Sequence, residues 1–207
     1  MLQKFFKDIF NKGNLKDYFK RNRIFILFAT VILILSLLSG FYSSSTYTYL
    51  AGSMMGQVST IAPLNNNVSD NMMVLFANNF LSDIYIVGMG LLLSIPSIIK
   101  TVLNGVLVGY IFSTQNFMKA FVSISFHGIF ELLALIFSLT GAFLVTKMEI
   151  RIISAIISRK KFDKALLRLK TPVKDLILSL VIVIILLIVA ALVEATLTPY
   201  LIHMFGF

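Results

Sequence analysis

Long runs of apolar residues, separated by short polar or basic stretches, dominate the hydropathy pattern of the chain. A helix needs about 20 mainly apolar residues to cross the roughly 30 Å hydrocarbon core of a bilayer. Runs of this kind predict five membrane-spanning helices, at about residues 24–42, 72–95, 97–112, 120–148 and 174–204. The predicted fold class is therefore all-α, a polytopic transmembrane helical bundle within residues 24–204.

The run from Asn71 to Phe112 is too long for a single crossing, and Pro96 and Lys100 interrupt it. Two crossings here place the nine Lys and Arg residues of segment 147–174 on the same side as the N-terminus, whereas one crossing places them on the opposite side. The positive-inside rule favours two crossings, with the N-terminus cytoplasmic and the C-terminus outside. Small residues let helices approach closely in lipid. Such packing is predicted at Gly88, Gly90, Gly105 and Gly109.

Two basic segments border the predicted spans. Residues 1–23 interleave aromatic residues with lysines and predict an amphipathic cytoplasmic segment, broken at Gly13-Asn14, with a solvated tail as the alternative. Residues 149–174 set isoleucines and leucines among charges and predict a basic amphipathic cytoplasmic helix. Thr171-Pro172 is interpreted as the start of the last helix. Both segments are expected to contact anionic lipid headgroups.

The composition agrees with a multi-pass protein of the cell membrane. The 207 residues are 58% hydrophobic and 13% charged, with a mean hydropathy of +0.92, whereas a soluble domain carries about a quarter charged residues. The net charge of +9 does not indicate a nucleic-acid partner, because all basic residues except Lys100 and Lys119 lie in the two segments beside the spans. The chain has no cysteine, which excludes thiolate catalysis and Cys-based zinc sites.

Seven polar side chains within the predicted spans form the candidate site: Asn78, Asn79, Asp83, Asn104, His127, Glu131 and Glu194. An ionisable group at the bilayer centre costs about 2.5–3.5 kcal/mol on insertion scales, so these groups are expected to face the bundle interior. His127 and Glu131 are four residues apart and leave the same face of one helix. The helical rise places four ionisable groups in one layer on three helices, where they are expected to meet: Asp83, His127, Glu131 and Glu194.

Four kinds of chemistry are open to this polar cluster. The first is a hydrogen-bonded framework that holds the helices together, and the second is ion or proton handling. The third is a divalent-metal site, for an ion such as zinc, with His127, Glu131, Glu194 and Asp83 as possible ligands. Hydrolysis is a remote fourth option, because the chain lacks the His-Glu-x-x-His motif of zinc proteases and has no nucleophile-elbow serine.

Several short motifs follow one another in order within residues 24–204. They are Phe76-Ala77-Asn78-Asn79, Leu103-Asn104-Gly105 with Gly109, His127-Gly128-Ile129-Phe130-Glu131-Leu132, Glu194-Ala195 and Thr198-Pro199. This ordered set resembles the stage II sporulation protein M family, and His-Gly-x-x-Glu is its most specific part. One departure is Phe126, at a position where a proline is expected in the family.

The resemblance implies a five-span membrane protein. In endospore-forming bacteria the family's namesake is a membrane scaffold that recruits two cell-wall hydrolases, and many relatives occur in organisms that form no spores. The first hypothesis is therefore a non-enzymatic scaffold for membrane or envelope proteins, without a cofactor, in which the polar cluster is an internal framework. The alternative is a transporter of an ion, a metal or a small solute that uses the same cluster. Five spans show no evident inverted repeat, so a homodimer is one way to complete a pathway.

Overall fold

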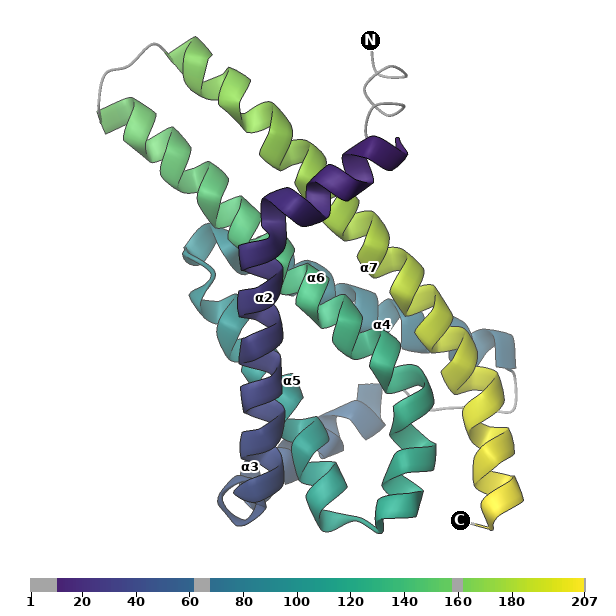
Figure 1. The fold of residues 1–207 in the computed structure, drawn as a ribbon. Coiled ribbons are helices and arrows are strands. Elements are labelled where there is room, and N and C mark those ends of the chain that lie inside the picture. The colour runs from purple at the N-terminus through teal and green to yellow at the C-terminus, as the bar shows by residue number, and fades with distance from the viewer. Residues whose placement is uncertain (1–10, 62–67, 158–161, 207) are drawn as a thin grey trace.

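The computed structural model describes residues 11–61, 68–157 and 162–206, which are almost entirely helical and contain no strand (Figure 1). The helices in chain order are α2 (Lys12–Tyr42), α3 (Ser44–Ile61), α4 (Val68–Gly88), the 3-10 helix η1 (Met89–Leu92), α5 (Ile95–Thr114), α6 (Phe117–Ile157) and α7 (Phe162–Phe205). The predicted all-α class is confirmed.

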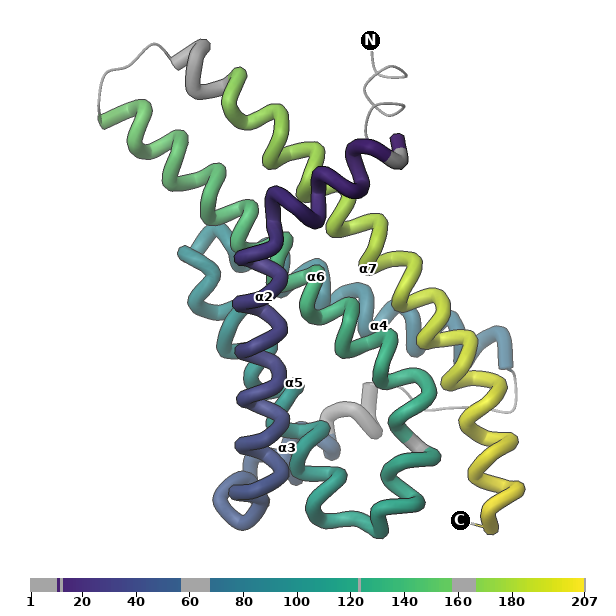
Figure 2. The backbone as a smooth tube through the Cα atoms, viewed as in Figure 1, coloured from purple at the N-terminus to yellow at the C-terminus, as the bar shows by residue number. Residues whose placement is uncertain are grey.

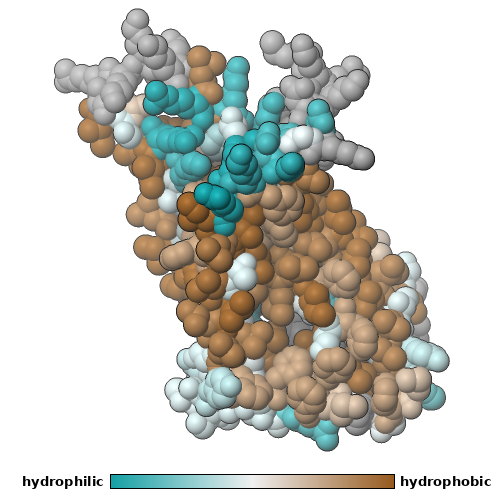
Figure 3. Space-filling model, in the orientation of Figure 1, coloured by the Kyte–Doolittle hydropathy of each residue, from teal (hydrophilic) through white to brown (hydrophobic). Residues whose placement is uncertain are grey.

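Five helical segments are long and apolar enough to cross a membrane: Gly13–Tyr42, Val68–Leu92, Ile95–Thr114, Ile124–Ile157 and Leu167–Phe205. Figure 3 shows the corresponding surface, an apolar band between two more polar ends. The five-span prediction and the location in a membrane are therefore confirmed. The C-terminal end of α7 lies at the opposite end of the bundle from the beginning of α2 (Figure 2). Which of these ends faces the cytoplasm stays a prediction.

The beginning of α2 and the beginning of α7 lie at the same end of the bundle. Arg21 Nη2 of α2 is 2.6 Å from Asp175 Oδ1 of α7. Hydrophilic side chains gather at this end in Figure 3. This is the arrangement expected if two crossings, and not one, lie between Asn71 and Phe112.

Helix α2 extends further toward the N-terminus than its hydrophobic run. Asn11 caps it by accepting a hydrogen bond from the Gly13 N–H at 3.1 Å, and the helix continues past Asn14 without a break. The predicted interruption at Gly13-Asn14 was therefore wrong, because the helix is capped at Asn11 and both residues lie in its first turn. Residues 1–10 of the predicted amphipathic segment lie outside the described residues.

The predicted helix start at Thr171-Pro172 was also wrong. Helix α7 begins at Phe162, and Pro172 lies inside it. A proline within a helix leaves the carbonyl four residues earlier without its N–H donor. Here that carbonyl belongs to Arg168, and Arg151 Nη1 of α6 donates to it at 3.0 Å. A neighbouring helix thus supplies the missing donor, and α7 continues through the proline.

The break between the second and third spans lies at Leu93-Ser94, slightly before the predicted position. Both residues have left-handed backbone angles, with φ of 54° and 58°, and Pro96 falls in the first turn of α5. Thr146 of α6 holds this turn, because its Oγ1 is 2.6 Å from Ser94 Oγ and donates to the Gly90 carbonyl at 2.6 Å. The division into two spans is confirmed.

Glycines bring α5 into direct backbone contact with α2. A Cβ added at Gly105 would lie 2.0 Å from Ser36 Oγ, one at Gly109 would lie 2.0 Å from the Leu37 carbonyl oxygen, and one at Gly40 would lie 2.1 Å from the Val106 carbonyl oxygen. Gly90 is similarly close to α6, whereas Gly88 has nothing within 4 Å. Close packing is confirmed at three of the four predicted glycines, and the prediction for Gly88 was wrong.

Helix α3 was not predicted. Its sequence alternates serines and threonines with apolar residues, and it is not one of the five candidate spans. It packs along α5, and Ser113 of α5 donates a hydrogen bond to Ser44 at 3.1 Å. Met54 of α3 reaches the polar cavity that lies among the spans.

Candidate functional site

A cavity of about 320 Å³ lies among α4, α5, α6 and α7. Six of the seven polar residues predicted within the spans line it: Asn78, Asn79, Asp83, Asn104, Glu131 and Glu194. They come from four different helices, so the cavity exists only because the bundle turns the polar face of each helix inward. We expected these polar groups to lie together because exposing them to lipid is costly, and the structure brings six of them to one cavity. Their function stays a prediction.

The wall contributed by α4 follows from helical periodicity. Asn79 and Asp83 are four residues apart and lie one above the other on the same face. Asn79 Nδ2 donates a hydrogen bond to Glu131 Oε1, which joins α4 to α6 across the cavity wall. Asp83 is only 3% exposed.

His127 is buried but is not among the residues that line the cavity. Its Nδ1 lies 3.3 Å from Thr198 Oγ1, and its Nε2 lies 3.9 Å from Glu194 Oε1. The second distance is too long for a hydrogen bond. His127 therefore joins α6 to α7 behind Glu194.

Three carboxyl groups give the cavity its electrostatic character. Glu131 is close enough to interact electrostatically with both Asp83 and Glu194. Among the described basic side chains, including His127, none lies within 4.0 Å of Asp83 or Glu131. The cavity is therefore rich in acceptors and suits a ligand that brings positive charge or N–H donors.

A metal site was one of the predicted uses of these residues. Within residues 11–61, 68–157 and 162–206, no group of three or more His, Asp or Glu side chains could hold one metal ion as the chain is arranged. Metal binding by His127, Glu131, Glu194 and Asp83 stays a prediction.

Three polar residues of the site were missed in the sequence. Ser82 and Lys100 line the cavity, and Thr198 contacts His127. Lys100 was interpreted only as an interruption between two spans. Its spacing of four residues from Asn104 could have placed it on the same face of α5, and the same spacing relates Thr198 to Glu194.

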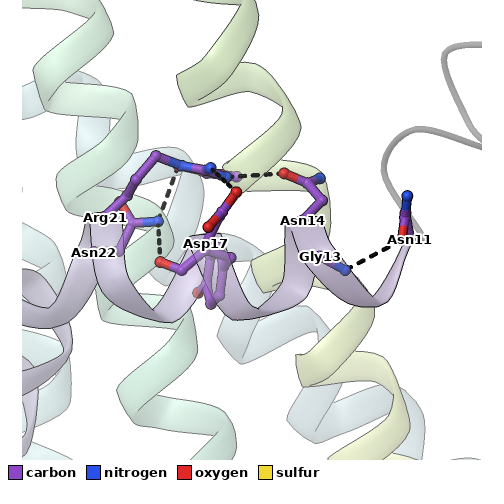
Figure 4. A network of polar contacts seen from close by, with 8 residues as sticks. Asn11, Gly13, Asn14, Asp17, Arg21 and Asn22 are labelled. Atoms are coloured by element: carbon purple, nitrogen blue, oxygen red, sulfur yellow. Dashed lines mark hydrogen bonds and ion pairs between the residues drawn. The ribbon is translucent and has the colours of Figure 1, made fainter.

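A second polar network lies at the basic end of the bundle (Figure 4). Asp175 of α7, which is 2% exposed, accepts hydrogen bonds from Arg21 Nη2 at 2.6 Å, Arg21 Nε at 3.1 Å and Asn22 Nδ2 at 3.0 Å. Arg21 also donates to Asn14 Oδ1 at 3.0 Å, and its Nη1 is 3.9 Å from Asp17 Oδ2. Apart from Asp175 of α7, these residues all lie on α2, so the network holds the first turns of α2 against α7.

The comparisons with known proteins agree with this architecture. The sequence profile described as stage II sporulation protein M matches residues 24–199. No curated protein and no solved structure has significant similarity to the chain. The matched region includes part or all of each of the five crossings, together with His127 and every polar residue of the cavity. The chain therefore belongs to the stage II sporulation protein M family.

Proposed function

We propose that this protein is a non-enzymatic membrane scaffold that positions partner proteins at the cell membrane. The observation that carries the proposal is the joined end of its two longest helices. We define the α6–α7 tip as residues 147–157 of α6 and 167–174 of α7. Helix α6 has 41 residues and α7 has 44, which at about 1.5 Å per residue is roughly twice the thickness of a hydrocarbon core. The tip extends beyond the turn between α4 and α5 (Figure 1).

The surface of the α6–α7 tip combines apolar and basic side chains. Five large apolar residues are between 46% and 76% exposed: Ile150, Ile153, Ile156, Ile157 and Leu167. The basic residues of the tip are Lys147, Arg151, Arg168, Lys170 and Lys174. The tip also contains one carboxylate, Glu149, so its net charge is positive, and an apolar surface of this kind suits a partner segment of the opposite sign. The occupant we propose is therefore an acidic, amphipathic segment of another membrane or envelope protein.

The basic residues also support an orientation. Those of the α6–α7 tip and those at the beginning of α2 lie at one end of the bundle. The positive-inside rule then supports a cytoplasmic tip and N-terminus, with the C-terminus outside. Contacts of this end with anionic lipid headgroups and a homodimeric assembly remain predictions.

The scaffold proposal can be tested by site-specific crosslinking. A photoreactive amino acid replaces Ile153 or Ile156 in living cells, and Ile188, an exposed residue within the α7 span, serves as the matched lipid-facing control. We expect a protein adduct at the two tip positions and not at Ile188. The captured protein, once purified, should bind the wild-type chain directly and at least tenfold more weakly after Lys170→Glu. Lys119→Glu, a reversal of an exposed charge outside the tip, should leave binding unchanged. Adducts with lipid alone at both tip positions would contradict the proposal.

A second candidate function, transport of an ion, a metal or a small solute, is favoured by the polar cavity. Its test is the flux of each candidate ion, metal or small solute into liposomes that contain the purified protein. Glu131→Gln is the variant and Asp70→Asn is the control. Asp70 is an exposed carboxylate on the same helix as Asp83 and does not line the cavity. Flux that is lost with Glu131→Gln and kept with Asp70→Asn would support transport, and equal flux in liposomes without protein would exclude it.

A further inference from the structure

The polar cavity has two chemically different walls. Helices α4, α6 and α7 contribute Asp83, Glu131 and Glu194, each of which offers only acceptors when ionised. Helix α5 contributes Lys100 and Asn104, which lie one helical turn apart on one face. Among the described residues, no acidic side chain lies within 4.0 Å of the Lys100 ammonium group. Positive and negative charges thus line one cavity without forming an ion pair with each other.

Burial makes this separation costly. Asp83 is 3% exposed and Lys100 is half-buried, and charges removed from water need partners of opposite sign. Lys100 is not within ion-pairing distance of any carboxyl group of the opposite wall, so a ligand with both charges would compensate both walls at once. A volume of about 320 Å³ is enough for a small organic molecule, because ligand pockets begin at about 300 Å³.

We propose that the cavity binds a small zwitterion, with its ammonium group toward Asp83, Glu131 and Glu194 and its carboxylate toward Lys100 and Asn104. An ammonium group supplies three N–H donors to acceptors on three helices. A carboxylate accepts charge-assisted hydrogen bonds from the lysine and a hydrogen bond from the Asn104 amide. This inference names a ligand class for the site on which the transport candidate rests, and it is independent of the scaffold proposal.

The test is equilibrium binding to the purified full-length protein in detergent or nanodiscs. The probes are glycine, β-alanine, 4-aminobutanoate and 6-aminohexanoate, because this series varies only the separation of the two charges. Each is compared with the alkylammonium and the alkanoate of matching length, and with sodium and magnesium chloride alone. The readouts are calorimetric binding and the shift of the thermal unfolding midpoint.

The variants separate the contributions of the two walls. Lys100→Met should weaken binding of the zwitterion at least tenfold, to the level of the alkylammonium analogue, and should leave that analogue unaffected. Glu194→Gln should weaken both, and it is preferred to a change at Asp83 because Glu194 is more exposed. Lys119→Met and Asp70→Asn are exposed, charge-matched controls that should leave binding unchanged.

Several outcomes would overturn the inference. They are the absence of saturable binding by every member of the series, equal binding of the alkylammonium analogue by the wild-type protein, and unchanged zwitterion binding after Lys100→Met. A midpoint shift that sodium or magnesium alone produces, and that Glu194→Gln removes, would assign the site to an inorganic cation instead. The assay requires neither a partner protein nor flux. Its failure is therefore distinguishable from failure of the scaffold proposal or of the transport candidate.

Discussion

The contact between α2 and α5 makes Gly109→Ala an informative change. A Cβ at this position would lie 2.0 Å from the Leu37 carbonyl oxygen and 2.8 Å from the Phe41 nitrogen. Both atoms belong to the backbone of α2, so no change of rotamer can make room. To reach an ordinary contact distance of 3.4 Å, the added carbon and the oxygen must separate by about 1.4 Å. The two helices must therefore move apart, which would also loosen the neighbouring contacts at Gly105 and Gly40.

The expected net effect is a loss of stability. Forcing an extra methyl group into a well-packed contact typically costs about 1–3 kcal/mol, and more where the backbone has to shift. Alanine recovers part of this cost, because it is more favourable than glycine inside a helix by about 0.5–1 kcal/mol. We therefore expect Gly109→Ala to lower the free energy of unfolding by about 1–2 kcal/mol or more.

Gly52→Ala is the matched control. Gly52 lies inside α3, and a Cβ there would meet nothing within 4 Å. This variant keeps the gain in helix propensity without the clash, so its stability should equal or slightly exceed that of the wild-type protein. Both free energies can be measured by denaturant titration in mixed micelles, followed by circular dichroism. If Gly109→Ala unfolds at the same denaturant concentration as Gly52→Ala, the close approach of α2 and α5 is refuted.

Two further predictions concern the end of the bundle where α2 and α7 begin, and both use the same titration. Asp175→Ala should lower the free energy of unfolding by about 1–3 kcal/mol, because it leaves the donors of Arg21 without their buried acceptor. Asp17→Ala removes only a long and exposed contact and should lower it by less than about 0.5 kcal/mol. Equal losses in the two variants would show that the network is not anchored on Asp175. Arg151→Ala should cost about 0.5–1.5 kcal/mol in the wild-type chain and clearly less in a Pro172→Ala background, where the helix supplies its own N–H donor. If the losses of stability from Arg151→Ala and Pro172→Ala simply add in the double variant, Arg151 does not replace the N–H donor that Pro172 lacks.

The crossings of the bilayer were predictable because their physical requirement is local. An apolar run either is or is not long enough to cover the hydrocarbon core, and no tertiary information is needed to decide this. The inward orientation of Asp83, Glu131 and Glu194 was predictable for a similar reason. The cost of exposing an ionisable group to lipid depends on the group and its depth, and only the bundle interior avoids it.

The helix boundaries were less predictable because they depend on neighbours. Pro172 removes a backbone hydrogen bond wherever it stands, and a helix normally ends there. Whether the helix continues depends on a donor from outside it, which Arg151 of α6 supplies. A residue 21 positions earlier in the chain carries no local sign that it will have this role.

The rotation of each helix about its axis was the other missing quantity. Gly88 and Gly105 are equally suited to close packing, yet only Gly105 faces another helix at backbone distance. Lys100 was interpreted as a break between spans. Whether its side chain faces lipid or the cavity depends on the rotation of α5 about its axis. Spacing alone relates Lys100 to Asn104 but does not show which neighbour that face meets.

Helix α5 links the tight packing to the polar cavity. Successive residues leave a helix about 100° apart, so Asn104 and Gly105 occupy adjacent faces of α5. One face carries Asn104 with Lys100 into the cavity, and the other carries Gly105 with Gly109 against α2. The backbone contact with α2 therefore sets how far the α5 wall stands from the carboxyl groups on α4, α6 and α7. An alanine at Gly109 that displaces α5 should change the separation of the two charged walls, and with it the chain length of the zwitterion that fits best.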